Sequence, residues 1–169
     1  VEKVTKEMRF RAKDLNFGVL YGMGASGFQK SAGVSRQEAQ AFIEDYFTRF
    51  PKIQEYVDLT KESARKNGYV ETLMGRKRYI NDINSTSAMH RSQAERMAIN
   101  HPIQGTAADI IKMAMVEISH KGLLNEDCRL TLQIHDELVF EIKKNKVETY
   151  AKKIQTIMEK AYKLSVPLN

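Results

Sequence analysis

Four residues near the start of the sequence combine positive charge with aromatic rings. Arg9, Lys13, Phe17 and Tyr21 recur every four positions, which on a helix of about 3.6 residues per turn places them along one slowly drifting face. Cations are unfavourable in the first turns of a helix, where the macrodipole is already positive, so they indicate a polyanionic ligand. Guanidinium and ammonium groups would bind phosphates, and the rings would offer flat surfaces to a sugar and a base. An amphipathic surface helix with two aromatic residues in a core would show the same spacing.

A second group of polar residues, His135, Asp136 and Glu137, lies between two alternating apolar segments. The alternation predicts two antiparallel strands, 130–134 and 138–142, with the acidic residues at the tip of a hairpin. A rigid hairpin suits Mg²⁺, a hard cation that takes carboxylate and phosphate oxygens in near-octahedral geometry. Solvated turn residues are the alternative interpretation.

Two further segments have side chains suited to nucleic acid. Arg76, Lys77 and Arg78 follow Gly75 at a predicted hairpin tip, where they are either solvated or bound to a phosphate backbone. Asn100 and Gln104 lie four residues apart on a helical pattern. Amides both donate and accept hydrogen bonds, which suits the acceptors of the DNA minor groove, although both amides could instead cap a broken helix.

The composition predicts a globular protein with an anionic partner. The 169 residues are 42% hydrophobic, enough to bury a sizeable core in one domain or at most two. Lys and Arg number 27 against 21 Asp and Glu, a formal charge of +6. The single cysteine, Cys128, cannot form an internal disulfide, which fits a reducing compartment and a buried thiol. No signal peptide or long apolar run occurs, so we expect an intracellular protein with no membrane partner.

The sequence also marks the limits of the elements that must hold these residues. Ser35 and Glu38 form a capping-box pattern, Gly68 is typical of a helix end, and Pro102 with Gly105 should bend a long helix. The aromatic residues between 42 and 56 are expected in the core. The expected elements are helices at about 4–22, 35–50 and 51–67, a strand at 69–74 that turns at Gly75 into a hairpin, a long helix at 89–121, a hairpin at about 129–142 and a final helix at about 145–164.

Three segments resemble signature motifs of the family A DNA polymerases, the bacterial DNA polymerase I type. They are Arg-x-x-x-Lys-x-x-Asn-Phe-Gly-x-x-Tyr-Gly at 9–22, Asn-x-Pro-x-Gln-Gly-x-Ala-Ala-Asp at 100–109 and Gln-Ile-His-Asp-Glu-Leu at 133–138. Gly75-Arg76-Lys77-Arg78 is similar to the family's Gly-Arg-x-Arg segment, whereas Phe10 departs from a second arginine often found there. The resemblance implies an α+β fold: a helical fingers portion at 1–85, followed by a partial palm at 86–169 with a long bent helix, an antiparallel β-hairpin and a C-terminal helix.

The resemblance also implies roles for individual residues. Arg9 and Lys13 would contact the triphosphate and act in catalysis with Asp136, Phe17 would pack on the nucleotide sugar, and Tyr21 would stack near the templating base. Asp136 would be the metal ligand. Because neighbouring residues on a strand point to opposite faces, Glu137 is expected to support this site without binding the metal equally. The implied DNA contacts are Arg76, Arg78, Arg96, Asn100, Gln104 and His135.

The implied function is template-directed DNA synthesis by a DNA-directed DNA polymerase, a nucleotidyltransferase of DNA replication and repair. Such an enzyme transfers a deoxynucleotide from a dNTP to a primer 3′-hydroxyl with two Mg²⁺ ions. The implied partners are primer-template DNA and dNTP, and the complete enzyme would be monomeric, cytoplasmic and nucleoid-associated. The strand that carries the family's first carboxylate, Asp-Tyr-Ser-Gln-Ile-Glu-like, does not occur in the sequence. We therefore expect the C-terminal part of a larger enzyme, without thumb or closing strand and inactive alone.

Two other functions compete with this interpretation. A non-catalytic basic module that binds nucleic acid would keep the fold without the chemistry, and it would show no preference for triphosphates with Mg²⁺. A metal-dependent hydrolase using His101, His135 and Asp136 is disfavoured, because no His-x-x-x-His or comparable ligand spacing occurs.

Overall fold

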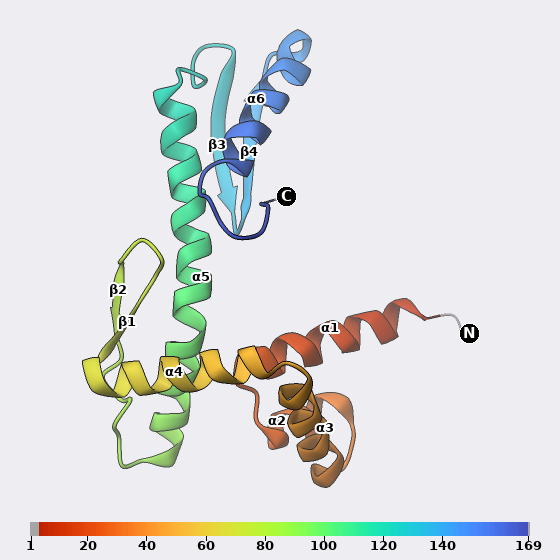
Figure 1. The fold of residues 1–169 in the computed structure, drawn as a ribbon. Helices are drawn as coiled ribbons and strands as arrows, with labels where there is room; N and C mark the ends of the chain where they lie inside the picture. Colours follow the sequence, from red (N-terminus) through yellow and green to blue (C-terminus); the bar gives the residue numbers. More distant parts are fainter. Residues whose placement is uncertain (1–3, 169) are drawn as a thin grey trace. The chain divides into compact units, whose positions relative to one another are not determined.

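The computed structural model describes residues 4–168, apart from the side chain of Arg11. The chain forms two compact units (Figure 1). The first unit contains the residues up to Glu71 together with Gly75–Pro102, and the second contains Thr72–Met74 together with the residues from Ile103 onward. The predicted division into fingers and palm after residue 85 rests on the resemblance and stays a prediction. Among residues 4–168, no helix is both long and apolar enough to cross a membrane.

Helices dominate the first unit, and local sequence signals set their ends. Thr5 begins the first helix, because its hydroxyl accepts a hydrogen bond of 3.1 Å from the Met8 amide. Ser35 and Glu38 form the predicted capping box. Gly68 ends the fourth helix in the left-handed conformation, with a φ of 77°. The helices are α1 (Lys6–Leu20), α2 (Ala25–Ala32), α3 (Arg36–Arg49), α4 (Pro51–Asn67) and the first part of α5 (Ala88–His120).

Two apolar clusters hold this unit together. One joins α1, α2 and α3 through Val19, Phe28, Ala39 and Tyr46, and the other joins α4, α5 and the segment between them through Ala64, Val70, Ile80, Ile83, Ala94 and Ala98. The expectation that the aromatic residues between 42 and 56 all lie in the core was wrong. Phe42 and Phe50 are about half exposed, because they lie at the edge of the ring cluster around Phe28 and Tyr46 rather than inside it.

A small antiparallel hairpin follows α4. Strand β1 (Tyr69–Glu71) pairs with β2 (Lys77–Tyr79), so that Val70 lies opposite Arg78. The predicted strand at 69–74 is therefore too long: the ladder ends at Glu71, and the next residue, Thr72, is buried. On the other face of the ladder the Lys77 ammonium lies 4.2 Å from the Tyr69 ring centroid, a cation–π contact that stiffens a short hairpin.

The long helix α5 confirms the helical pattern at 89–121 and contains Pro102. Proline has no amide hydrogen, so one carbonyl of the preceding turn loses its helical donor. In this turn before Pro102, within the first unit, the Tyr56 hydroxyl of α4 donates a 2.7 Å hydrogen bond to the Ile99 carbonyl. The bend expected at Pro102 and Gly105 stays a prediction.

The second unit packs a β-hairpin against two helices. Strands β3 (Cys128–Ile134) and β4 (Glu137–Ile142) are followed by a 3₁₀ turn (Lys144–Lys146) and α6 (Val147–Glu159). The core contains Ile118, Leu123, Cys128, Ile154 and Ile157, which confirms a buried thiol. The final helix is shorter than the predicted 145–164, because Lys160 and Ala161 donate to carbonyls three residues back and tighten the last turn.

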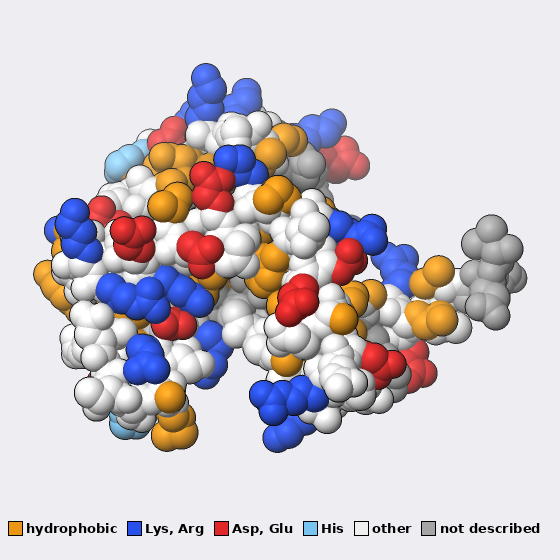
Figure 2. Space-filling view, turned by 60° about the horizontal axis from the view of Figure 1, so that its bottom comes forward, with side chains coloured by type: hydrophobic (Ala, Val, Ile, Leu, Met, Phe, Trp, Pro, Cys, Tyr) orange, Lys and Arg blue, Asp and Glu red, His pale blue; other side chains and the backbone are white. Residues whose placement is uncertain are grey.

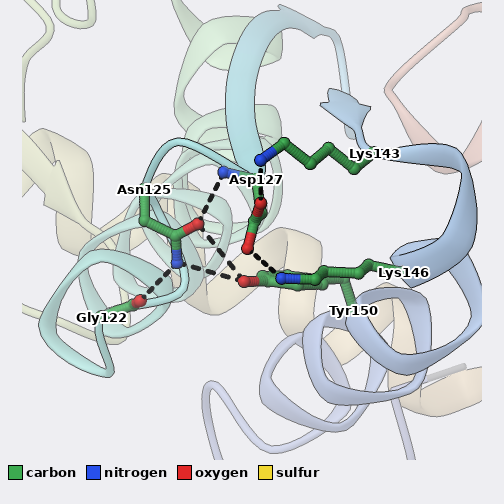
Figure 3. A network of polar contacts seen from close by, with 6 residues as sticks. All are labelled: Gly122, Asn125, Asp127, Lys143, Lys146 and Tyr150. Atoms are coloured by element: carbon green, nitrogen blue, oxygen red, sulfur yellow. Dashed lines mark hydrogen bonds and ion pairs between the residues drawn. The ribbon is translucent and has the colours of Figure 1, made fainter.

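A polar network around Asp127 closes the second unit where β3 starts (Figure 3). The Asp127 carboxylate pairs with the Lys143 ammonium at 2.6 Å and also with Lys146. Its amide donates to the Asn125 side chain at 2.9 Å, and Asn125 in turn donates to Tyr150 of α6 at 3.1 Å. Only 13% of the Asp127 side chain is exposed. Since its partners lie on separate segments, the network joins the turn after α5 to the connection between β4 and α6.

This network makes the stability of the second unit depend on pH. Hydrogen bonds from Lys143, and then from Lys146, hold the pKa of the Asp127 carboxyl below its usual value. A lowered folded-state pKa stabilises the fold above the unfolded pKa of about 3.9, and this stabilisation is lost as pH falls through the folded value. The hydrogen bond to Asp127 also raises the pKa of Lys146. The contribution of Lys146 to stability is therefore lost only at strongly alkaline pH.

Asp127→Asn is expected to lower the urea midpoint of unfolding at neutral pH, because the amide keeps the shape but removes both ion pairs. The difference from wild type should shrink as the pH is lowered through the folded-state pKa of Asp127, where the wild-type carboxyl is protonated as well. Glu117→Gln is the matched control, since Glu117 forms only an exposed pair with Lys121 at 3.3 Å. A deficit that stays constant down to low pH would contradict the proposed role of the charge.

Candidate functional site

One face of α1 carries the basic and aromatic side chains. The Phe17 and Tyr21 rings stack with centroids 6.0 Å apart and an interplanar angle of 18°, and the Lys13 ammonium lies 5.9 Å from the Phe17 centroid. Phe17 is 42% exposed, so it is not a core residue as the competing interpretation of this helix required. Lys13, Phe17 and Tyr21 therefore share a face that is open to a ligand.

Two cations of this helix have charges that no described side chain neutralises. Arg9 and Lys13 are exposed, and neither forms an ion pair with any side chain that the structure describes. Val19 is only 1% exposed and joins the cluster with Phe28, so it anchors the opposite side of the helix. The arrangement leaves two unpaired positive charges on one helix, and for Arg9, in the first turn of α1, the macrodipole adds to the attraction for an anion.

A cleft of about 770 Å³ opens at the end of α1, within the first unit. Its walls include Tyr21, Gly22, Ser26, Arg36, Ser92 and Arg96. Gly22 has a φ of 83°, and a Cβ at this position would lie 3.2 Å from the Arg96 Cγ. Glycine is therefore required both for the turn and for the close approach of the Arg96 stem. Two predicted residues from distant parts of the sequence, Tyr21 and Arg96, thus line one cleft.

Arg36 belongs to this cleft but to none of the predicted motifs. It is the first residue of α3, directly after the Ser35 cap. A cation in the first turn of a helix is the same signal that drew attention to Arg9, so the sequence contained evidence for Arg36. What the sequence lacked was the packing of α3 beside the end of α1.

The other predicted DNA contacts of the first unit lie on two elements. Arg76 precedes β2, and Arg78 lies on β2, exposed and opposite Val70. Asn100 lies on α5, and its buried Oδ1 makes no hydrogen bond with a described residue. A buried acceptor without a donor is costly and indicates a place where a ligand or water could bind. His101, which the hydrolase alternative required, is 8% exposed.

The acidic hairpin lies in the second unit. Its turn contains two residues, His135 and Asp136, and not three as predicted, because Glu137 already pairs with Ile134 at the start of β4. His135 has a φ of 54°, the left-handed conformation that a tight hairpin turn demands. All three polar side chains are exposed, as is Gln104 on α5.

The described residues do not complete a metal centre. Among residues 4–168, no three His, Cys, Asp or Glu side chains cluster closely enough to hold an ion. An exposed carboxylate such as Asp136 suits Mg²⁺ chemically, but the described residues offer it no set of protein ligands. The structure therefore presents a cationic and aromatic surface in one unit and an acidic tip in the other.

Surface charge is mixed rather than uniform. On the face drawn in Figure 2, acidic side chains lie among the Lys and Arg side chains across the surface. Several surface cations are paired with carboxylates, for example Arg65 and Lys61 with Glu95 at 2.6 and 3.3 Å. Attraction for an anion is thus concentrated at unpaired cations such as Arg9 and Lys13, and not spread over the molecule.

Comparison with known proteins gives consistent matches along the whole chain. The thermostable DNA polymerase I of Thermus aquaticus is 47% identical over 167 residues, which are 99% of this chain and 20% of that protein. DNA polymerase I of Pseudomonas aeruginosa is 46% identical over 172 residues, covering 99% of this chain and 18% of that protein. The chain therefore spans about a fifth of the length of these curated relatives.

A solved structure and a family profile extend the match. The POL domain of Pol1 from M. smegmatis, in complex with DNA primer-template and dNTP, superposes with a TM-score of 0.90 at 40% identity, over 99% of this chain and 30% of that chain. The sequence profile described as DNA polymerase family A matches residues 1–169. Since this match leaves no part of the sequence outside it, the chain belongs to DNA polymerase family A.

Proposed function

We propose that this chain is the part of a DNA polymerase that binds the incoming nucleotide and part of the primer-template. The observation that carries the proposal is the exposed face of α1, where unpaired cations precede a stacked ring pair. The similar POL domain is described in complex with primer-template DNA and dNTP, which supports the same ligands here. The whole reaction would be attack of a primer 3′-hydroxyl on the α-phosphate of a dNTP.

The α1 side chains divide this task by their chemistry. Arg9 and Lys13 bind the triphosphate, because charge-assisted hydrogen bonds from two cations compensate for the hydration that the phosphates lose. Phe17 packs against the sugar, and Tyr21 lies where the templating base stacks. Since phosphoryl transfer depends mainly on positioning and charge stabilisation, Arg9 and Lys13 contribute to catalysis by holding the phosphates in line.

DNA is held by residues of both units. Arg76 and Arg78 contact phosphates, and Arg96 contributes from α5. Asn100 and Gln104 read minor-groove acceptors, which all correct base pairs share nearly alike, so binding does not depend on sequence. His135 lies at the tip of the acidic hairpin and contacts the primer end.

Asp136 is proposed as one ligand of the two Mg²⁺ ions, with Glu137 beside it on β4. When bound, such ions lower the pKa of an attacking hydroxyl and neutralise phosphate charge. The described residues bring no cluster of ligands around Asp136, so no step of the reaction can be assigned to this chain alone. We propose that the complete enzyme is monomeric and acts in the cytoplasm at the nucleoid.

Lys13→Ala and Arg78→Ala separate nucleotide binding from DNA binding. Lys13→Ala should weaken binding of dNTP with Mg²⁺ by about 1.5–3 kcal/mol, the value of a charge-assisted contact, and should change duplex binding little. Arg78→Ala should instead weaken duplex binding, and it should reduce the slope of the logarithm of the duplex binding constant against the logarithm of salt concentration by about one unit. Isothermal titration with dNTP and fluorescence anisotropy with a labelled duplex measure the two effects.

Lys30→Ala serves as the control for both variants, because Lys30 is an exposed cation on α2 outside the cleft and the α1 face. Suppose that all three variants weakened the binding of dNTP and of duplex DNA equally. The protein would then have one general basic surface without separate nucleotide and DNA sites. That result would favour the non-catalytic basic module over the polymerase.

The 169-residue chain alone should not extend a primer at any Mg²⁺ concentration, because the described residues gather no set of ligands around Asp136 and phosphoryl transfer depends on metal ions held in place. A primer-extension assay measures this, with Asp136→Asn run beside it to reveal contaminating polymerase. Extension that occurs in wild type and disappears in Asp136→Asn would show that this chain assembles a working metal site after all.

A further inference from the structure

A small groove in the second unit lies between the end of α5 and one face of α6. It has a volume of about 550 Å³ and is lined by Lys121, Leu123, Lys152, Lys153, Thr156 and Ile157. Residues three and four positions apart share a face of a helix, so the α6 residues of this lining lie together. Every charged group in the lining is an ammonium. The groove belongs to a different unit from the α1 face and shares no residue with it.

The floor of the groove is apolar and belongs to the core of the second unit. Leu123 and Ile157 are each 8% exposed and join the same cluster as Ile118 and Ile154. Gly122 has a φ of 67°, and this left-handed turn after α5 allows Leu123 to pack inward. The aliphatic stems of the lysines extend the apolar surface, because lysine needs to keep only its ammonium in water. The groove therefore offers a fixed apolar seat with positive charge around its rim.

Two of the three rim lysines are free to bind an anion. Lys121 directly follows α5, where a cation complements the helix dipole, and it pairs with Glu117 at 3.3 Å. Lys152 and Lys153 lie inside α6 instead, and both are exposed. Neither of them forms an ion pair with a side chain among the described residues. Local helix electrostatics thus explain Lys121 but not the two adjacent ammonium groups on α6.

The chain around the groove is strongly positive. Residues 143–163 contain seven lysines and two glutamates, so most of the formal charge of +6 lies in this segment. Lys143 and Lys146 are already bound to Asp127. The lysines of α6 and of the residues after it are therefore the main source of the positive field. Such a field attracts an acidic partner and raises its rate of association.

An acidic peptide fits this groove better than a nucleic acid does. The lining contains no aromatic ring on which a base could stack, and no arginine that could bind a phosphate through two parallel hydrogen bonds. A phosphate would pair with the ammonium groups but would leave the apolar floor uncovered. A peptide supplies both parts, because an apolar side chain can contact the floor while flanking carboxylates pair with Lys152 and Lys153.

The composition of the rim indicates an occupant that binds reversibly. Permanent interfaces are more apolar than reversible ones, and lysine is depleted at the centre of interfaces. Three lysines around a small apolar floor keep the groove hydrated when it is empty. They also limit the affinity, because each exposed ion pair contributes little. A partner protein that binds and dissociates suits such a surface better than a fixed part of the same enzyme.

We propose that this groove binds a short acidic segment of a partner protein. An apolar side chain of the segment contacts Leu123 and Ile157, and its carboxylates pair with Lys152 and Lys153. The inference adds a protein-binding surface to a chain whose proposed function concerns nucleotide and DNA. It holds whether or not α1 binds a nucleotide, because the groove and the α1 face lie in different units.

Fluorescence anisotropy with the labelled peptide Glu-Asp-Glu-Leu-Asp-Glu tests this inference on the 169-residue chain. We expect binding that weakens as the salt concentration rises, and weaker binding of the same peptide with serine in place of leucine. The double variant Lys152→Gln with Lys153→Gln should bind the peptide about fivefold more weakly, since each exposed ion pair contributes little. Its binding of dNTP with Mg²⁺ and of a blunt duplex should not change.

The double variant Lys160→Gln with Lys163→Gln is the matched control. Both of these lysines are exposed, lie just after α6 and are outside the groove. The control removes the same charge from the same region, so it should weaken peptide binding less than the variant of Lys152 and Lys153 does. Equal losses in the two double variants would overturn the inference, as would a wild-type chain that does not bind the peptide or does not distinguish leucine from serine. A groove variant that loses duplex binding instead would make the groove a DNA contact.

The complete enzyme distinguishes a partner protein from the rest of the same polymerase. If another part of the enzyme covers the groove, the peptide binds the 169-residue chain but not the complete enzyme, and the inference fails. Binding to both, with the same dependence on Lys152 and Lys153, supports it. Failure of the proposed function would instead appear as loss of the Lys13-dependent dNTP binding, which neither double variant affects.

Discussion

Close packing of one methionine, Met23, between two glycines fixes the end of α1. A Cβ added at Gly18 would lie 2.4 Å from the Met23 Cε, and one at Gly27 would lie 2.9 Å from its Cγ. The turn between α1 and α2 is therefore specified by the absence of side chains. Because Val19 is buried on the inner side of α1, the face that carries Phe17 and Tyr21 lies outward. The cleft forms beside this face.

Much of the fold follows from local signals that act within a few residues. The capping box at Ser35 starts α3 and the left-handed Gly68 ends α4, both as predicted, because each satisfies backbone groups next to it. The errors arise where tertiary contacts override local preference. Thr72 leaves the strand pattern to be buried, and α6 ends early in a tightened turn although its apolar spacing continues.

The candidate site shows the same division. Spacing and resemblance identified the α1 face and the acidic hairpin, since each is continuous in sequence. The cleft could not be predicted, because Arg36 and Arg96 lie on separate elements and meet only through the packing of α1, α2, α3 and α5. The sequence also could not predict which charged side chains form ion pairs. The structure shows that Glu95 pairs with Lys61 and Arg65, and it gives Arg96 no ion pair with a described side chain.

His135 at the hairpin tip has a backbone conformation that favours a different residue type. A non-glycine residue with a φ of 54° is held in a conformation that costs about 1 kcal/mol or more relative to glycine. Selection for stability alone would replace this imidazole with glycine or asparagine, both of which accept the turn without strain. Thermostabilising screens that score only folding should therefore accumulate substitutions at this position, and each would remove the side chain next to Asp136.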